Sequence, residues 1–139
     1  MDQNLGDEKY SAEDLRYLQQ LYEEQYHMLT DSISAVIDEL NRLNAVQKVI
    51  ESSESVDGHD LLIDLGSNFF MKGKALKMDS FIVGIGAGYF VEMPTERAKE
   101  YAVKNLERKS AELNALNSNK RKIEESLLSV MYKLQAAEK

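Results

Sequence analysis

Three alternate glycines in an apolar stretch are the part of this chain closest to a ligand-binding motif. The stretch FIVGIGAGYFVEM covers residues 81–93 and contains Gly84, Gly86 and Gly88. Glycine-rich loops can cradle phosphate through their backbone N–H groups. A dinucleotide fingerprint requires G-x-G-x-x-G before a helix, but the sixth position here is Tyr89 and a strand-like YFVEM follows. We interpret Gly86 and Gly88 as turn residues, and Gly84 as a bulge or a close approach of another backbone.

The other reactive side chains form no recognisable catalytic or metal site. The chain has no cysteine, which excludes disulfides, thiolate ligands and cysteine nucleophiles. Its two histidines, His27 and His59, have no His or Cys three or four residues away to complete a metal site. The carboxylates are scattered over polar helix faces. We therefore predict a protein that is not an enzyme and that holds no cofactor and no metal ion.

The composition favours long, solvated helices over a deep globular core. The chain has 139 residues, one proline, 29% charged and 43% apolar residues, which suits one domain. A net charge of −7 argues against binding to nucleic acid or anionic membranes. The first residues lack the features of a signal peptide, and no apolar run approaches the roughly 20 residues that span a bilayer. We expect a cytoplasmic protein.

Two heptad repeats flank the glycine-containing segment. The first begins with a capping-box sequence, SAED at 11–14, and predicts a helix over 11–53. Its apolar seam recurs every seven residues, at Leu15, Tyr22, Leu29, Val36, Leu43 and Ile50. The second follows Pro94 and predicts a helix over 95–137. Alternating spacings of three and four indicate that the two helices pair as an antiparallel coiled coil.

Lys109 and Lys120 interrupt the second seam. One interpretation is that their aliphatic stems cover the seam while the amines reach water. The other is that a polar residue in the seam fixes the alignment of the two helices at a cost in stability. Both interpretations remain open at the level of sequence.

The segment between the helices repeats itself at an offset of twenty residues. LLIDLGSNFFMK at 61–72 aligns with FIVGIGAGYFVE at 81–92, and ten of the twelve columns pair similar residues. Each copy has two apolar runs around a short turn, which is typical of a β-hairpin. We predict two tandem hairpins over 61–93. Their turn glycines are Gly66, Gly86 and Gly88.

Hairpins as apolar as these are expected to bind other chains. An isolated two-stranded sheet is marginal in water, and open apolar edges pair with other strands. We therefore predict that the strands assemble with equivalent strands of other subunits. The residues expected to make this contact are Leu61, Leu62, Ile63, Leu65, Phe69, Phe70, Phe81, Ile82, Val83, Ile85, Tyr89, Phe90 and Val91.

The helix ends near the termini carry more apolar side chains than a two-helix seam can bury. Leu5, Tyr10, Leu15, Tyr17 and Leu18 lie on one side, and Leu127, Leu128, Val130, Met131, Tyr132 and Leu134 lie on the other. Of these, Tyr17, Leu128 and Tyr132 fall off the seam. One interpretation is a frayed seam end with ordinary exposed residues. The other is an adaptable apolar surface that grips another protein.

The order helix, two tandem hairpins, helix resembles the alpha-class subunits of prefoldin. The most specific stretch covers 60–101, where VGIGAGYFVE is similar to the family pattern V-x-x-G-x-G-Y/V-x-V-E before a helix with an acidic start. The resemblance implies a mainly α fold with a small β part and a single domain over 1–139. In that fold a long antiparallel coiled-coil hairpin carries the β-hairpins at the end opposite the termini and oligomerises through a β-barrel platform.

The resemblance also implies a function. Prefoldin is an ATP-independent holdase in which two alpha-class and four beta-class subunits form a hexamer. It binds unfolded client proteins at the coiled-coil tips and delivers them to a group II chaperonin. The tip residues implied here are Leu15, Leu18, Tyr22, Leu127, Met131 and Leu134.

Two alternatives accompany this reading. DLGSNFF, which contains Asp64, is also similar to the alpha-class paralogue of eukaryotic prefoldin-like complexes, which are co-chaperones in the assembly of large machines. A purely structural coiled-coil assembly protein that holds no clients is a hypothesis of a different class.

Overall fold

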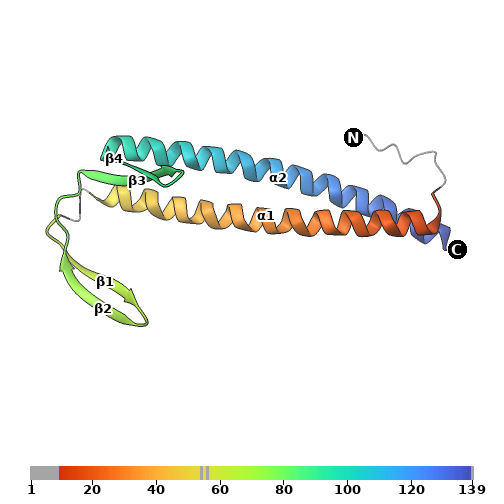
Figure 1. The fold of residues 1–139 in the computed structure, drawn as a ribbon, viewed down its shortest axis with the longest axis horizontal. Helices are drawn as coiled ribbons and strands as arrows, with labels where there is room; N and C mark the ends of the chain where they lie inside the picture. The colour runs from red at the N-terminus through yellow and green to blue at the C-terminus, as the bar shows by residue number, and fades with distance from the viewer. Residues whose placement is uncertain (1–9, 54, 56, 139) are drawn as a thin grey trace. The chain divides into compact units, whose positions relative to one another are not determined.

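The computed structural model describes residues 10–53, 55 and 57–138 and contains two long helices and two β-hairpins (Figure 1). In chain order the elements are α1 (Ala12–Ser52), β1 (Asp60–Gly66), β2 (Phe69–Lys74), β3 (Ser80–Gly86), β4 (Tyr89–Pro94) and α2 (Thr95–Ala137). The predicted mainly α fold with two tandem hairpins is confirmed. The predicted helices over 11–53 and 95–137 differ from α1 and α2 by at most one residue at each end.

The chain divides into two compact units. The helix-end unit combines the start of α1, up to Ile37, with the end of α2, from Ala111. The hairpin unit, Asp38–Ser110, combines the end of α1, both hairpins and the start of α2. Each unit has a small apolar core of its own.

Helix α1 begins with the capping box that the sequence predicts. The Ser11 hydroxyl accepts a hydrogen bond from the Asp14 N–H at 3.1 Å, and the Asp14 carboxylate accepts one from the Ser11 N–H at 3.4 Å. These two bonds satisfy backbone donors that a helix start leaves unpaired. The capping box therefore fixes where α1 starts.

The predicted seam of α1 is largely buried. Leu15, Tyr22, Val36 and Ile50 are buried, while Leu29 and Leu43 are half-buried. Residues near the start of α1 contact the end of α2, since Arg16 pairs with Glu138 and Tyr26 contacts Lys120. The helices of the helix-end unit therefore run antiparallel, as an apolar heptad repeat on both sides allows.

Both lysines that interrupt the second seam have a partner on the other helix. In the helix-end unit, Lys120 Nζ lies 5.3 Å from the centroid of the Tyr26 ring. In the hairpin unit, Lys109 Nζ lies 3.2 Å from Glu39 Oε2 and its side chain is only 24% exposed. A cation over an aromatic ring and a half-buried ion pair both depend on how the helices are aligned. These contacts favour the interpretation in which the lysines fix that alignment.

Reversing the charge at Lys109 should weaken the helix pair. Lys109→Glu would place a second carboxylate beside Glu39, and we expect the free energy of unfolding to fall by about 1 kcal/mol. The charge-swapped double variant Glu39→Lys/Lys109→Glu should regain most of this loss. Urea unfolding followed by circular dichroism measures both. A double variant no more stable than Lys109→Glu alone would show that the pair contributes nothing.

The repeat seen in the sequence is reproduced in the pairing of the strands. Each hairpin is antiparallel, and every residue pair of the first has its counterpart twenty residues later in the second. Equivalent pairs include Leu61–Gly73 with Phe81–Met93 and Ile63–Met71 with Val83–Val91. The register skips Leu65 in the first hairpin and Ile85 in the second. The two hairpins are therefore one structural unit used twice, with the same bulge before the turn.

Both turns share a left-handed backbone. Positive φ angles occur at Gly66 (88°), Ser67 (52°) and Asn68 (65°), and at Gly86 (111°), Ala87 (51°) and Gly88 (79°). Two central residues with positive φ define a type I′ turn. Gly84 serves another purpose, because a Cβ there would lie 3.2 Å from Cε1 of Phe90. Within this chain, the absence of a side chain at Gly84 makes room for the cross-strand aromatic ring, and Gly84 also borders the bulge, which is one of its two predicted roles.

Gly86→Ala should destabilise the second hairpin. The site has open space around it, so the cost comes from forcing an alanine to a φ of 111° and should be about 1–2 kcal/mol. Hydrogen exchange of the β3 and β4 amides should become faster. The control is Ala87→Gly, which relieves a positive φ of 51° and should leave the exchange rates nearly unchanged. Equal effects of the two variants would contradict this account of the turn.

Candidate functional site

The six predicted tip residues separate into buried and exposed members. Leu15, Tyr22 and Leu134 are 2%, 7% and 8% exposed and form the core of the helix-end unit together with Val130. Leu18 and Leu127 are half-buried against this core. Met131 is 51% exposed. The seam residues therefore support the surface of this unit, and other side chains form most of it.

The exposed apolar side chains are the ones that fall off the seam. Tyr17, Leu128 and Tyr132 are 63%, 67% and 76% exposed. Heptad spacing selects buried positions, so an apolar residue outside the heptad pattern is the sequence signal for the exposed surface. Leu5, which the sequence places in the same apolar group, lies outside the described residues.

A groove on α2 brings together two of these side chains and the exposed Met131. Leu128, Met131 and Tyr132 line it together with the edge of Leu134, and Arg16 and Gln19 of α1 complete the opposite wall. The Arg16 guanidinium pairs with the Glu138 carboxylate at 3.1 Å at the groove. The paired charges compensate each other, so the groove offers an apolar, adaptable surface with no net charge.

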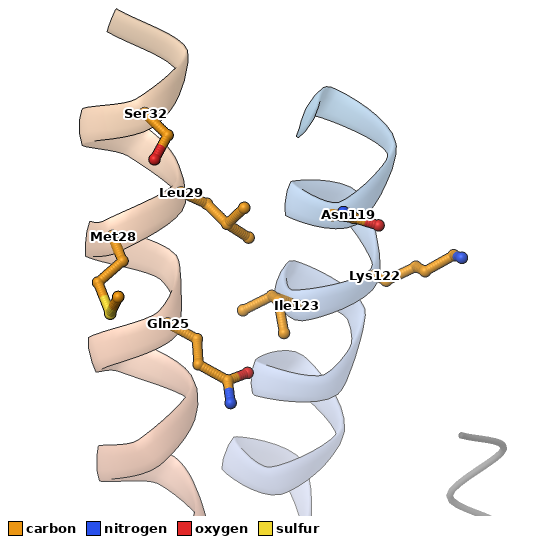
Figure 2. A pocket seen from close by; sticks show the side chains of 7 residues that line it. All are labelled: Gln25, Met28, Leu29, Ser32, Asn119, Lys122 and Ile123. Atoms are coloured by element: carbon orange, nitrogen blue, oxygen red, sulfur yellow. The ribbon is translucent and has the colours of Figure 1, made fainter. Parts of the chain in front are cut away.

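A second hollow lies beside the seam within the helix-end unit. Figure 2 shows Leu29 of α1 and Ile123 of α2 pointing toward each other across the helix pair. Gln25, Met28 and Ser32 line the hollow from α1, and Asn119 and Lys122 line it from α2. The Lys122 ammonium group points away from α1 (Figure 2). Met28, at 70% exposed, is the most open apolar side chain at this hollow.

In the hairpin unit, the second hairpin covers the helices with one of its faces. Phe81 and Val83 of β3 and Met93 of β4 pack against a cluster of small and aliphatic helix residues. That cluster consists of Ile50, Ala98 and Ala102. Small alanine side chains allow the strands to approach the helix closely. This contact stabilises the second hairpin, which would be marginal alone.

The equivalent face of the first hairpin is open. Leu61, Ile63 and Met71 are 37%, 39% and 50% exposed. The other face of the same hairpin is mixed: it pairs Asp60 with Lys74 across the strands and carries Leu62 and Phe70, which are 67% and 55% exposed. Of the strand residues predicted to contact other subunits, Phe81 and Val83 are half-buried and the rest are exposed. The first hairpin therefore presents an apolar face without cover among the described residues.

The two histidines are exposed in the structure. His27 lies edge-on to Tyr26 with ring centroids 6.0 Å apart, and His59 accepts a backbone hydrogen bond from Ala75. Among residues 10–53, 55 and 57–138, no three metal-ligating side chains come together as a possible metal site. In the same part of the chain, neither helix offers an apolar stretch long enough to cross a membrane.

Two long helices interrupted by two tandem β-hairpins define a coiled-coil subunit of the prefoldin type. A family model described as "Prefoldin subunit" matches residues 22–139, so the chain belongs to the prefoldin family. Members of this family are chaperone subunits, and this chain is therefore a chaperone-type subunit.

Relatives assign the class within the family. "Probable prefoldin subunit 5" of Dictyostelium discoideum is 26% identical over 145 residues, covering 97% of this chain and 89% of its own length. "Prefoldin subunit alpha" of Thermoplasma acidophilum is 34% identical over 92 residues, covering 63% of this chain and 71% of its own length. These names identify the chain as an alpha-class subunit, as the sequence resemblance predicts.

A solved structure supports the fold. A chain of a filamentous PFD from Methanocaldococcus jannaschii matches with a TM-score of 0.60 at 19% identity. The match covers 87% of this chain and 95% of that chain. At this identity the likeness concerns the arrangement of helices and hairpins alone.

Proposed function

We propose that the chain is the alpha-class subunit of a cytoplasmic, ATP-independent holdase. Two copies assemble with four beta-class subunits through their β-strands in a β-barrel platform. The complex binds unfolded client proteins at the helix ends and delivers them to a group II chaperonin. Membership of the prefoldin family supports the chaperone class, and the exposed surfaces of the two units support the separate roles of helix ends and hairpins.

The observation that carries client binding is the groove on α2. Leu128, Met131 and Tyr132 keep half or more of their surface exposed although a buried core lies directly beside them. A contiguous apolar surface of this kind is unusual unless another molecule covers it. Unfolded segments expose apolar side chains without a fixed shape, and a flexible methionine suits such ligands. Leu134, which lines the groove, packs in the core with Leu15 and Tyr22.

The observation that supports assembly is the difference between the two hairpins. Their registers are identical, and the apolar face of the second is covered by Ile50, Ala98 and Ala102 of its own chain. The same face of the first, with Leu61, Ile63 and Met71, is exposed. Burial of a face this apolar is favourable, so we propose that another subunit covers it.

Polar substitutions in the groove should impair holding. Leu128→Ser/Tyr132→Ser removes two exposed side chains, so we expect the fold to persist while client affinity falls several-fold. The assay is light scattering from a chemically denatured model client, in which about twice as much variant complex should be needed for the same suppression of aggregation. The control is Ile37→Ser, which alters an exposed aliphatic residue outside the groove. Unchanged suppression by the double variant would reject client binding at the groove and favour a purely structural coiled-coil protein.

Asp64 does not decide between prefoldin and the prefoldin-like complex. Its carboxylate accepts a hydrogen bond from the Gly66 N–H at 2.8 Å and thus stabilises the bulge before the turn. That role is local and serves either complex. Identifying the proteins that co-purify with the tagged chain distinguishes the two complexes. Beta-class prefoldin subunits and chaperonin are expected for the holdase. The partners of the prefoldin-like complex are expected for the alternative.

A further inference from the structure

An apolar strip on α1 lies apart from the groove on α2. Tyr17 and Met28 are 63% and 70% exposed, and Leu21 between them is half-buried. Residues spaced by four, seven and eleven positions share one side of a helix. The strip formed by Tyr17, Leu21 and Met28 therefore extends over roughly 16 Å, at 1.5 Å per residue. None of the three lines the groove of Leu128, Met131 and Tyr132.

One end of this strip opens into the hollow of Figure 2. Met28 is one of the residues that line it, and Leu29 and Ile123 of the seam point toward each other between the two helices. A hollow between two paired helices, bordered by side chains from both, is the kind of site into which a side chain of a third helix inserts. Lys122 stands on the far wall, but its ammonium group points away from α1, so it leaves the strip open (Figure 2).

The strip has an acidic border. Glu13, Glu24 and Asp31 are exposed and, at spacings of eleven and seven residues, lie along the same side of α1 as Tyr17 and Met28. Between residues 12 and 37, α1 carries five carboxylates and one cation, Arg16, which is paired with Glu138. The part of α2 in the same unit carries four carboxylates and four cations over residues 111–138. Negative charge is thus concentrated on α1, beside the strip.

We propose that this strip docks a basic amphipathic helix of a partner protein as a third helix beside α1. Apolar side chains of the partner would cover Tyr17, Leu21 and Met28, and one of them would enter the hollow above Leu29. Lysine or arginine residues along its edge would face Glu13, Glu24 and Asp31, as charged residues flank the seam of a coiled coil. The strip is thereby a second interaction surface, with a different charge preference from the client groove.

The test uses the full chain and two labelled probe peptides. One is an amphipathic helix of leucine and lysine, and the other has glutamate in place of every lysine. Fluorescence anisotropy should show binding of the lysine peptide alone, and its affinity should fall several-fold between 50 and 200 mM salt. Tyr17→Ser/Met28→Ser should weaken it about tenfold, and Glu24→Gln/Asp31→Asn about five-fold.

Two controls separate this proposal from net charge and from client binding. Glu51→Gln/Glu107→Gln removes the same charge from exposed sites in the hairpin unit and should leave peptide affinity within twofold of the parent chain. Leu128→Ser/Tyr132→Ser should impair suppression of client aggregation but leave peptide binding unchanged. Tyr17→Ser/Met28→Ser should weaken peptide binding but leave suppression of client aggregation unchanged. Equal weakening by both charge variants, or unchanged binding after loss of Tyr17 and Met28, would overturn the proposal whatever the outcome of the holding assay.

Discussion

Val130→Asp is expected to lower the free energy of unfolding by about 3 kcal/mol or more. Val130 has no exposed surface and lies in the core with Leu15, Tyr22 and Leu134. A carboxylate there would have neither water nor a cation as a partner, because the surrounding side chains are apolar. Urea unfolding followed by circular dichroism should show a large fall in the midpoint.

The matched control for this substitution is the next residue in the chain. Met131 is 51% exposed, so Met131→Asp introduces the same charge where water can solvate it and should change stability by less than about 1 kcal/mol. Val130 lies in the seam and Met131, one residue later, lies in the groove. Comparing the stability loss of the two variants therefore measures the cost of burying the carboxylate. If the two variants lose the same stability, Val130 is not part of a core.

The helices and hairpins could be predicted because each has a local signal. The capping box of Ser11 and Asp14 indicates where α1 starts. The apolar heptad positions from Leu15 to Ile50 indicate which side of the helix is buried. The turns could be located from Gly66 and Gly86, since few other residues adopt a positive φ without strain. The repeat at an offset of twenty residues even anticipates the shared strand register, which depends on turn geometry and alternation within each copy.

The interaction surfaces could not be predicted as fully, because the exposure of a side chain depends on which elements pack against it in the folded chain. Heptad spacing places Leu15, Tyr22 and Leu134 in the seam, and their burial leaves little of their surface for a client. The open surface is formed by off-seam residues such as Leu128 and Tyr132. Nor do the two hairpins differ in pattern, although only the second covers helix residues of its own chain. Such asymmetry arises from tertiary packing, which the alternation of side chains along a strand does not encode.

Ile63→Glu is expected to weaken assembly with other subunits by at least about 100-fold. Ile63 lies at the centre of the open face, paired with Met71 and with its Cδ1 atom within 3.2 Å of where a Cβ on Gly73 would lie. If a partner covers this face, the substitution removes about 2 kcal/mol of apolar burial and adds a carboxylate that must lose its water. Native mass spectrometry of the complex over a dilution series should show dissociation at higher concentration than for the parent chain.

Leu62→Glu tests whether that effect depends on the face or on the charge alone. Leu62 neighbours Ile63 on β1 but points to the opposite face, where its cross-strand partner is Lys72. A glutamate at 62 would meet that lysine across the strands, so both the hairpin and the assembly should persist. Greater loss of assembly from Leu62→Glu than from Ile63→Glu would place the subunit contact on the other face. In that case, the face that the second hairpin buries against its own helices would not be the face through which the first hairpin binds another subunit.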